Sequence, residues 1–401
     1  MTNHPEPTRR DFLAASAFSL LGLTSRATGV HVSVESAADS QLLYVGTYTE
    51  GKRTEGVHLA RMDIRSGDLQ LVRSFDAGAN PSFLAIHPNG KVLYAVSEVD
   101  EREGKPTGAV GAFAILRDTG ELTRINEQPS EGAAPCYVSV DRKGRVVLVA
   151  NYNGGNVALL PIEPSGALSA ATSVEKHSGR GPNAERQEGP HAHCVVADPS
   201  NRFALAVDLG IDRVVLYRLD VGGRSLRHME SGDAMLKPGA GPRHLAFHPH
   251  LPLVYVANEL DSTVTTLRLE RDDSTLAVLG TRSTLPDGWS GTSYVADIHV
   301  APSGRTLYVS NRGHNSIAVF AIGEATGLLA LEQVVSTGGD WPRNFSLDPT
   351  GRWLVVGNQR SGSVVVLQRD QATGRLTPTG KQLTVAAPAC VRFRQRVGVT
   401  A

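Results

Sequence analysis

Several histidine, arginine and acidic side chains from His193 onward could together hydrolyse a polarised ester. His193 lies in the segment GPHAH, Arg243 in GPRH and Glu259 in NEL. A neutral histidine can act as a general base toward water, and arginines can stabilise an oxyanion or bind a carboxylate or phosphate through two parallel hydrogen bonds. Glu259 could orient the histidine or position the water. No G-x-S-x-G segment is present, which disfavours a covalent serine mechanism.

The same residue types also allow two other interpretations. Arg243 and Arg343 could simply form ion pairs with acidic neighbours such as Glu259 that close gaps between structural units. His191 and His193 are two residues apart, so in a strand their side chains would point the same way and could bind a metal ion. No acidic cluster accompanies them in the sequence, and we therefore predict neither a metal site nor a cofactor.

The candidate residues belong to a pattern that recurs seven times along the chain. Each unit can be aligned on an anchor residue, and the anchors are Pro81, Pro135, Ala192, Pro242, Val295, Pro342 and Pro388. After each anchor, a short alternating segment such as PRHLAFHP leads into a turn and then a second apolar strand such as LVYVA. Two further strands follow in most units. Four antiparallel strands per unit are typical of a propeller blade.

The two ends of the chain complement each other in this repeat. The first unit, beginning at QLLYVGTYTEG, lacks an inner strand, and the C-terminal segment PACVRF supplies one. A ring closed in this way leaves few free strand edges, whereas an open array or two sandwiches would leave the matching half-units unexplained. The sequence therefore predicts an all-β fold, a seven-bladed β-propeller over residues 41–396 whose N- and C-terminal strands share one blade.

The register of the repeat places two series of residues on one face of the predicted disc. The residues directly after the anchors are Ser82, Cys136, His193, Arg243, Ala296, Arg343 and Ala389. The chain returns to the same face sixteen residues after each of the first six anchors, and the residues just beyond are Glu98, Tyr152, Leu209, Glu259, Arg312 and Gln359. Polar groups that converge on one funnel indicate an active site. We select as substrate-binding candidates His191, His244, His299, His314, Arg343 and Asn344. The opposite face carries turn residues such as His87 and His248, which we interpret as structural.

The composition disfavours some classes of partner and cross-link. The 401 residues include 40 Lys plus Arg and 40 Asp plus Glu, so the chain offers no basic field for nucleic acid or anionic lipid. The cysteines, Cys136, Cys194 and Cys390, are odd in number and far apart. They fit small core residues better than a disulfide framework or a zinc ribbon, although a single bridge between two of them stays open.

The N-terminus predicts export from the cytoplasm. The segment TRRDFL at residues 8–13 has a twin-arginine pattern and is followed by a modest apolar run that ends at Leu23. The run is too short to span a bilayer comfortably, so we interpret residues 1–29 as a signal for the twin-arginine export machinery. The mature protein is then expected to be periplasmic or secreted, with no membrane span. If the pattern is a coincidence, the chain is cytoplasmic.

In the repeat and at the candidate site residues, the sequence resembles the lactonase family typified by the propeller-type 6-phosphogluconolactonases. That family also includes the fungal carboxymuconate cyclases. The resemblance covers nearly the whole mature chain and is carried by YVGTYTEG, EGPHAHCVVADPSNRFALAVDLGIDRV, GPRHLAFHPHLPLVYVANELDSTV, ADIHVAPSGRTLYVSNRGHNSIAVF and PRNFSLDPTGRWLVVGNQRSGSVVV. It implies metal-independent opening or closing of a lactone. The functional set that it implies falls on His193, Arg243, Glu259 and either Arg312 or Arg343, of which we select Arg312.

The resemblance favours one function and leaves two alternatives. We expect a hydrolase that opens a sugar-type lactone, with a small-molecule lactone or sugar acid as its ligand. A non-catalytic extracytoplasmic propeller that binds a sugar acid or a protein through the same funnel is one alternative. A muconate-type lactonising cycloisomerase, whose arginines would hold carboxylates, is the other. The predicted export signal points away from a cytoplasmic phosphogluconolactone as the natural substrate.

Overall fold

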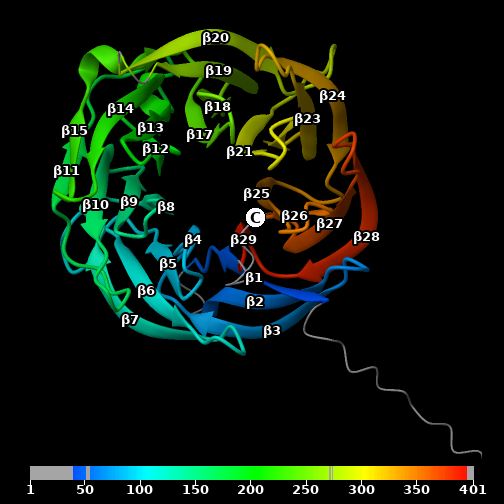
Figure 1. The fold of residues 1–401 in the computed structure, drawn as a ribbon, viewed down its shortest axis with the longest axis horizontal. Coiled ribbons are helices and arrows are strands. Elements are labelled where there is room, and N and C mark those ends of the chain that lie inside the picture. Colours follow the sequence, from blue (N-terminus) through cyan, green and yellow to red (C-terminus); the bar gives the residue numbers. More distant parts are fainter. Residues whose placement is uncertain (1–38, 51–54, 271, 273, 395–401) are drawn as a thin grey trace, which may run out of the picture. The chain divides into compact units, whose positions relative to one another are not determined.

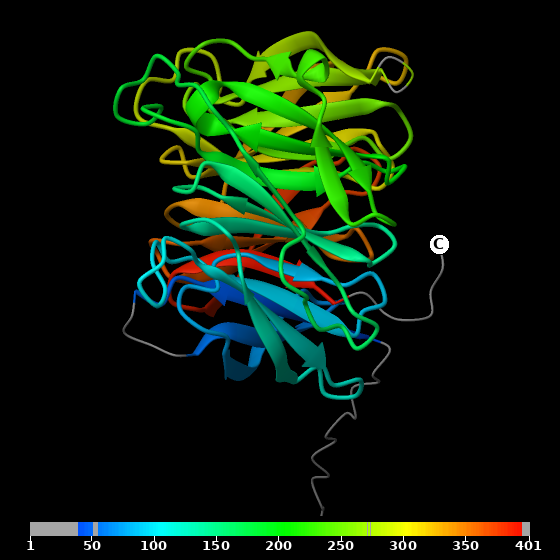
Figure 2. The same ribbon diagram turned by 90° about the vertical axis from the view of Figure 1, so that its left-hand side faces the viewer.

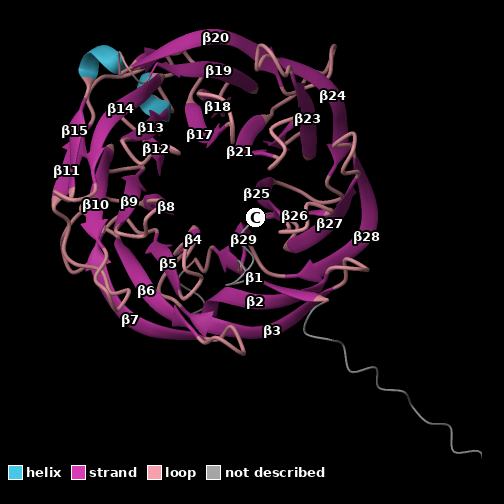
Figure 3. Ribbon diagram, in the orientation of Figure 1, coloured by secondary structure: helices cyan, strands magenta, loops and turns pink. Residues whose placement is uncertain are grey.

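The computed structural model describes residues 39–50, 55–270, 272 and 274–394, so the export signal predicted at residues 1–29 lies outside the described residues. The described chain is built almost entirely of β-strands, which form seven antiparallel sheets around a ring (Figure 1, Figure 3). Two short 3-10 turns, η1 (Leu209–Ile211) and η2 (Glu230–Gly232), connect successive strands of one sheet. The prediction of an all-β, seven-bladed propeller is confirmed.

Each blade runs from an innermost strand near the ring centre to an outer strand (Figure 1). Blade 1 consists of β29 (Pro388–Phe393), β1 (Ser40–Thr47), β2 (Glu55–Asp63) and β3 (Leu69–Asp76). Blade 2 consists of β4 (Leu84–Ile86), β5 (Val92–Ser97), β6 (Ala109–Ile115) and β7 (Leu122–Pro129). Blade 3 consists of β8 (Pro135–Val140), β9 (Val146–Asn151), β10 (Asn156–Pro161) and β11 (Ser173–Lys176). Blade 4 consists of β12 (Ala192–Ala197), β13 (Phe203–Asp208), β14 (Arg213–Asp220) and β15 (Ser225–His228), with β16 (Ala234–Met235) also paired to β14.

The remaining blades repeat the same order. Blade 5 consists of β17 (Pro242–Phe247), β18 (Leu253–Asn258), β19 (Thr263–Glu270) and β20 (Thr275–Ser283). Blade 6 consists of β21 (Tyr294–Val300), β22 (Thr306–Arg312), β23 (Ser316–Ile322) and β24 (Leu329–Ser336). Blade 7 consists of β25 (Pro342–Leu347), β26 (Trp353–Asn358), β27 (Ser363–Arg369) and β28 (Leu376–Thr384). Figure 2 shows the ring from the side, with the connecting loops gathered at its two faces.

The hydrophobic core lies between neighbouring blades. Every residue of β5, β9, β13, β18 and β26 is buried, because each of these second strands is covered by a blade on either side. Continuous apolar runs such as residues 146–150 are the sequence signature of strands buried on both faces. Outer strands such as β3 and β28 instead consist mostly of exposed and partly buried residues. The blades therefore stabilise one another by stacking around the ring.

A tyrosine in the second strand ties four of the blades to the next one. Its hydroxyl donates to the carbonyl oxygen of a glycine in the turn before the neighbour's outer strand, at 2.6 to 3.0 Å. These tyrosines are Tyr44, Tyr94, Tyr255 and Tyr308. The bonds give each of these hydroxyl protons an acceptor inside the protein. On the opposite edge of the blades, His87 and His248 contact glycine carbonyls of the following blade at 3.0 and 2.9 Å, which fits their structural interpretation.

The two ends of the chain close the ring in blade 1. Strand β1 pairs antiparallel with β29, with Leu43 opposite Phe393 and Val45 opposite Val391. Innermost strands of neighbouring blades contact one another around the whole ring. All three cysteines are buried free thiols in innermost strands, so the bridge that the sequence left open is not formed. Within the described ranges, none of the helices has the length and hydropathy that a bilayer crossing requires.

Candidate active site

A pocket of about 200 Å³ lies at the strand ends that the repeat register placed on one face. It is lined by Glu98, Cys136, Tyr152, Arg186, His193, Glu259, Arg312 and Arg343. Seven of these residues belong to the two series derived from the sequence, and they come from blades 2 to 7. Arg186 is the exception, because it lies in the loop between β11 and β12. Three of the four predicted catalytic residues therefore line one pocket.

A β-bulge at the start of the innermost strand presents a side chain to this pocket in several blades. In blade 4 the pairing skips from Ala192 to Cys194, so His193 has no partner on the neighbouring strand. The same irregularity leaves Cys136 unpaired in blade 3 and Arg343 in blade 7. A bulge inserts one extra residue and re-aims its side chain relative to the regular alternation of the strand. This repeated irregularity explains why the residue after the anchor is so often a pocket residue.

Glu259 directly follows β18 and is surrounded by three guanidinium groups. Its Oε1 lies 2.7 Å from Nη2 of Arg186, and its Oε2 lies 2.6 Å from Nη2 of Arg312. Nε of Arg243 is 3.0 Å from the same Oε2, but its N–H makes no hydrogen bond, so this contact is an ion pair of poorer geometry. Burial disfavours the charged carboxylate, yet the arginines lower the pKa of Glu259 to about 2. Glu259 is therefore a stable anion that holds arginines in place and a poor acceptor for a proton from water.

Arg243 lies beside the pocket and is not among its lining residues. It is 2% exposed, and its Nη1 donates to the carbonyl oxygen of Ala296 at 2.5 Å. Burial lowers the pKa of Arg243, and burial likewise lowers the pKa of Arg312 to about 9. At neutral pH Arg312 still carries its charge in the pocket wall. The structure thus places Arg243 behind Glu259 and Arg312 at the surface that a ligand would meet.

His193 is buried in the pocket wall without a carboxylate partner in the described part of the chain. It is 5% exposed, its Nδ1 lies 3.6 Å from Sγ of Cys136, and its ring packs edge-on against His244 with centroids 5.3 Å apart. Burial, followed by the positive charge of Arg243, lowers the pKa of His193 well below its usual value of 6.5. The imidazole is consequently neutral at physiological pH, which is the state that a general base requires.

Three predicted substrate-binding residues, His244, His299 and Asn344, form a network outside the pocket lining, in which His244 and Asn344 are buried and His299 is partly exposed. His244 Nδ1 lies 2.8 Å from Oδ1 of Asp297, so its Nε2 can accept from Nη1 of Arg243 at 3.1 Å. The other carboxylate oxygen of Asp297 accepts from His299 Nε2 at 2.9 Å and from Asn344 Nδ2 at 2.5 Å. Burial lowers the pKa of His244 to about 3. The network fixes the orientation of Arg243 without lining the pocket.

The other predicted substrate-binding residues divide between the pocket and its surroundings. His191 stacks on Tyr152 with ring centroids 4.4 Å apart, and thus supports one wall from behind. His314 packs against Trp289, with centroids 5.0 Å apart, beside a different hollow. Arg343 lines the pocket, and its Nη2 donates to the hydroxyl of Tyr48 at 2.6 Å. Among the six, only Arg343 lines the pocket.

Known proteins with the same repeat identify the family. The profile of the family described as "Lactonase, 7-bladed beta-propeller" matches residues 42–393. This chain belongs to that lactonase family. The 6-phosphogluconolactonase of Bacillus subtilis strain 168 is 40% identical over 354 residues, which cover 88% of this chain and 98% of that protein. The periplasmic gluconolactonase of Pseudomonas aeruginosa superposes with a TM-score of 0.82 at 32% identity, over 89% of this chain and 99% of that one. A putative 6-phosphogluconolactonase from Bacteroides fragilis superposes with a TM-score of 0.81 at 33% identity, with coverage of 89% and 99%.

Membership in the lactonase family confirms the resemblance found in the sequence and makes this chain an enzyme of the lactonase class. Within the candidate pocket, Glu98, Cys136 and Tyr152 stood in the aligned series but were not selected as site residues. Arg186 was missed, because the repeat assigns no register to the loop at residues 177–191. The unusual length of that polar connection, compared with the equivalent loops of other blades, was the signal available in the sequence.

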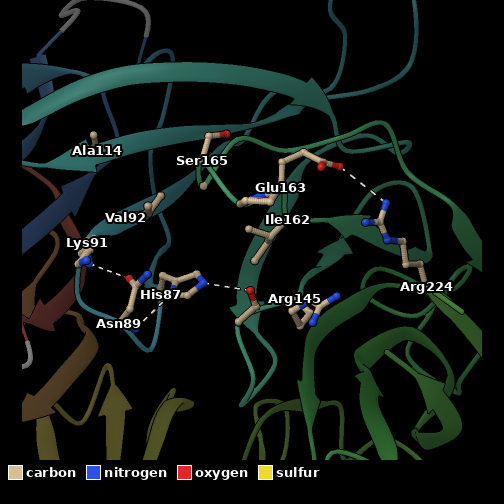
Figure 4. A pocket seen from close by; sticks show the side chains of 13 residues that line it. His87, Asn89, Lys91, Val92, Ala114, Arg145, Ile162, Glu163, Ser165 and Arg224 are labelled. Atoms are coloured by element: carbon tan, nitrogen blue, oxygen red, sulfur yellow. Dashed lines mark hydrogen bonds and ion pairs between the residues drawn. The ribbon is translucent and has the colours of Figure 1, made fainter. Parts of the chain in front are cut away.

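A larger hollow of about 800 Å³ lies away from the candidate pocket and is lined mainly by blades 2 and 3 (Figure 4). Its polar groups are engaged locally. His87 Nε2 contacts the carbonyl oxygen of Gly144 at 3.0 Å, and Arg224 pairs with Glu163 at 3.7 Å. Arg224 and the nearby Lys91 are exposed, whereas Glu259, Arg243 and Arg312 are buried. Buried ionisable groups with strongly shifted pKa values mark functional sites, which favours the smaller pocket.

Replacing Cys136 with serine is expected to leave kcat within about threefold of the wild type. Burial raises the pKa of the Cys136 thiol well above 9, so the nucleophilic thiolate is scarce at neutral pH, and the serine hydroxyl can still contact His193. Steady-state kinetics on a lactone substrate would measure the effect. A loss of 10³-fold or more, together with an acyl adduct on Cys136 detected by mass spectrometry, would instead identify the thiol as a nucleophile.

Proposed function

We propose that this lactonase hydrolyses a sugar-type lactone that carries an anionic group, with His193 as the base that activates water. The proposal is supported by the names of its relatives, a 6-phosphogluconolactonase and a periplasmic gluconolactonase. The observation that carries it is a neutral histidine beside three arginines in the wall of one pocket. These are the groups that ester hydrolysis needs, a proton acceptor and a fixed positive field for the oxyanion.

His193 would act through Nε2. If Nδ1–H points to Sγ of Cys136 at 3.6 Å, Nε2 carries the lone pair and accepts a proton from water. The water oxygen then bonds to the lactone carbonyl carbon, and negative charge develops on the carbonyl oxygen. Arg312 or Arg343 would stabilise this charge, because both guanidinium groups line the pocket and are fixed by other contacts. Arg243, which does not line the pocket, would hold Glu259 in place, and its positive charge would help to stabilise the oxyanion.

The charge balance of the site supports an anionic substrate. Arg186, Arg243 and Arg312 surround the single carboxylate of Glu259, so two positive charges remain uncompensated in that cluster. Arg343 adds a further positive charge from blade 7. Guanidinium groups bind phosphate and carboxylate oxygens through paired hydrogen bonds. A phosphorylated or carboxylated lactone should therefore have a lower KM than its neutral counterpart.

Export by the twin-arginine machinery is part of the proposal. It is supported by the TRRDFL segment at residues 8–13 and by similarity to a relative described as periplasmic. Changing Arg9 and Arg10 together to lysine in the full chain should abolish its recovery from the periplasmic or extracellular fraction. Equal export of the changed and unchanged chains would contradict a twin-arginine route.

A panel of lactones tests the proposed function. Purified full-length chain would be assayed with 6-phosphoglucono-, glucono-, galactono- and simple aliphatic lactones, with the spontaneous rate subtracted and the products identified. Ring opening faster than the buffer rate is expected. The phosphorylated lactone should be preferred over gluconolactone because of its negative charge, and in this panel it serves as a probe of anion binding and not as the natural substrate of an exported enzyme. Binding of a sugar acid without turnover would instead indicate a non-catalytic propeller. Formation of a lactone from an unsaturated diacid would indicate the cycloisomerase.

A further inference from the structure

Glu98 is a second carboxyl group in the pocket, and its surroundings differ from those of Glu259. It follows β5 of blade 2, whereas Glu259 follows β18 of blade 5, three blades away around the ring (Figure 1). Both side chains line the same pocket of about 200 Å³. A six-membered lactone ring that filled so small a pocket would contact several of its walls. The two carboxyl groups can therefore act on one substrate from different sides.

The groups that contact Glu98 are hydroxyls. The hydroxyl of Tyr48 lies 2.8 and 3.0 Å from its two oxygens, and Oγ of Ser82 contacts Oε2. Arg343 donates to Tyr48 at 2.6 Å and lies over the Tyr48 ring, so its hydrogen bond goes to the tyrosine, while its charge acts on Glu98 without an ion pair. Among the described residues, Glu98 forms no ion pair of its own, in contrast to Glu259. Its position is fixed by neutral groups, which do not require it to be charged.

We propose that Glu98 is a further catalytic residue of this pocket, the acid that protonates the ring oxygen as the lactone opens. The inference rests on the proposed lactone hydrolysis. Burial raises the pKa of Glu98, against the opposing effects of Arg343, the hydroxyl contacts and Arg243, whereas the arginines lower that of Glu259. Cys136 is a further titratable neighbour of Glu98. Burial, followed by the charge of Glu98, raises the pKa of its thiol. Two carboxyl groups whose environments separate their pKa values are typical of an acid and a charged partner in one active site.

The proposed step balances with His193 as the base. Water forms the new bond to the carbonyl carbon and gives one proton to His193. When the tetrahedral intermediate collapses, the bond between that carbon and the ring oxygen breaks, and Glu98 gives its proton to the ring oxygen. The product is the open hydroxy acid. The proton on His193 returns through solvent to the Glu98 carboxylate, so the enzyme regains its starting state.

The variant Glu98→Gln tests this role, because glutamine keeps the shape and can still contact Tyr48 and Ser82 but has no acidic proton to give. We expect kcat for the best lactone of the panel to fall about 10²-fold or more, with KM changed less than threefold. The pH profile supplies the decisive readout. Wild-type kcat should fall at high pH as Glu98 loses its proton, and this alkaline limb should be absent in the variant.

Ser82→Ala is the matched control, since it removes one contact of Glu98 and leaves the carboxyl group in place. It should keep the alkaline limb and lose less than tenfold in kcat, and thermal melts would verify that both variants fold. Glu98→Gln activity within threefold of the wild type would overturn the inference. So would a slow variant that keeps the wild-type alkaline limb, a result that would assign both proton transfers to His193. A wild-type chain that opens no lactone would contradict the proposed function itself, which is a separate outcome.

Discussion

The variant His193→Gln is expected to lower kcat for lactone opening by about 10²- to 10⁴-fold, the usual contribution of a general base. Glutamine can occupy the bulge position in β12, but its amide cannot accept a proton from water. KM should change little, because the pocket arginines Arg312 and Arg343 remain in place. Steady-state kinetics of the full-length variant with the preferred lactone would measure both constants.

The pH dependence should separate a chemical role of His193 from a structural one. A base must be deprotonated, so wild-type activity should rise with pH as His193 loses its proton, at a pH well below 6.5. The variant should lack this acid limb. His228→Gln is the matched control, because His228 lies on the outer strand β15 of the same blade and contacts Asp233, away from the pocket lining. An unchanged kcat in His193→Gln, or an equal loss in the control, would rule out His193 as the base.

Glu259→Gln should be the most destabilising single change in the pocket, lowering the free energy of unfolding by about 3–5 kcal/mol at pH 7. The change leaves Arg186, Arg243 and Arg312 close together without the carboxylate that compensates them. Because the same arginines would bind and stabilise the substrate, kcat/KM should fall strongly as well. Urea unfolding monitored by tryptophan fluorescence would give the stability, and kinetics on the preferred lactone would give the activity.

The stabilisation by Glu259 should also depend on pH in a defined direction. Its pKa is lowered in the folded state from 4.5 to about 2, so folding favours the charged form. The corresponding stabilisation, roughly 3 kcal/mol, is complete above pH 4.5 and is lost as the pH falls toward 2. In Glu259→Gln this acid-dependent part should be missing. Asp68→Asn is the control, since its partner is the surface Lys381, and stability should not change measurably. A Glu259→Gln chain as stable as the wild type would contradict the role of Glu259.

The fold could be read almost completely from the repeat. Turn residues, alternating inner strands and fully apolar second strands each specify local structure, and their recurrence leaves little choice of topology. The matching half-units at the two ends predicted the pairing of β1 with β29. The structure confirms it, since residues 43–47 of β1 pair with residues 388–393 of β29. What the sequence pattern did not reveal is the bulge that recurs after the anchor in several blades, as at His193, because a bulge is defined by pairing with the neighbouring strand and not by local sequence alone.

The candidate site was predictable to the extent that it follows the repeat. Seven of the eight lining residues stand at the two register positions derived from the sequence. Arg186 could not be placed, since a loop outside the repeat can cross to any blade, and only the folded chain brings it to Glu259. Histidines such as His244 and His314 were expected near a ligand because of their residue type. The structure places His244 behind the pocket and His314 beside another hollow.

The sequence by itself determined the blades, the ring closure, the family and the face on which polar residues gather. It could do so because strand periodicity, turn residues and repeat register are local properties that recur in every repeat unit. Only the tertiary structure decided which charges meet. Three arginines from different segments converge on Glu259, whereas Glu98, at the same register position of another blade, meets hydroxyl groups. Ionisation depends on burial and on neighbours across blades, and these are set when the ring closes.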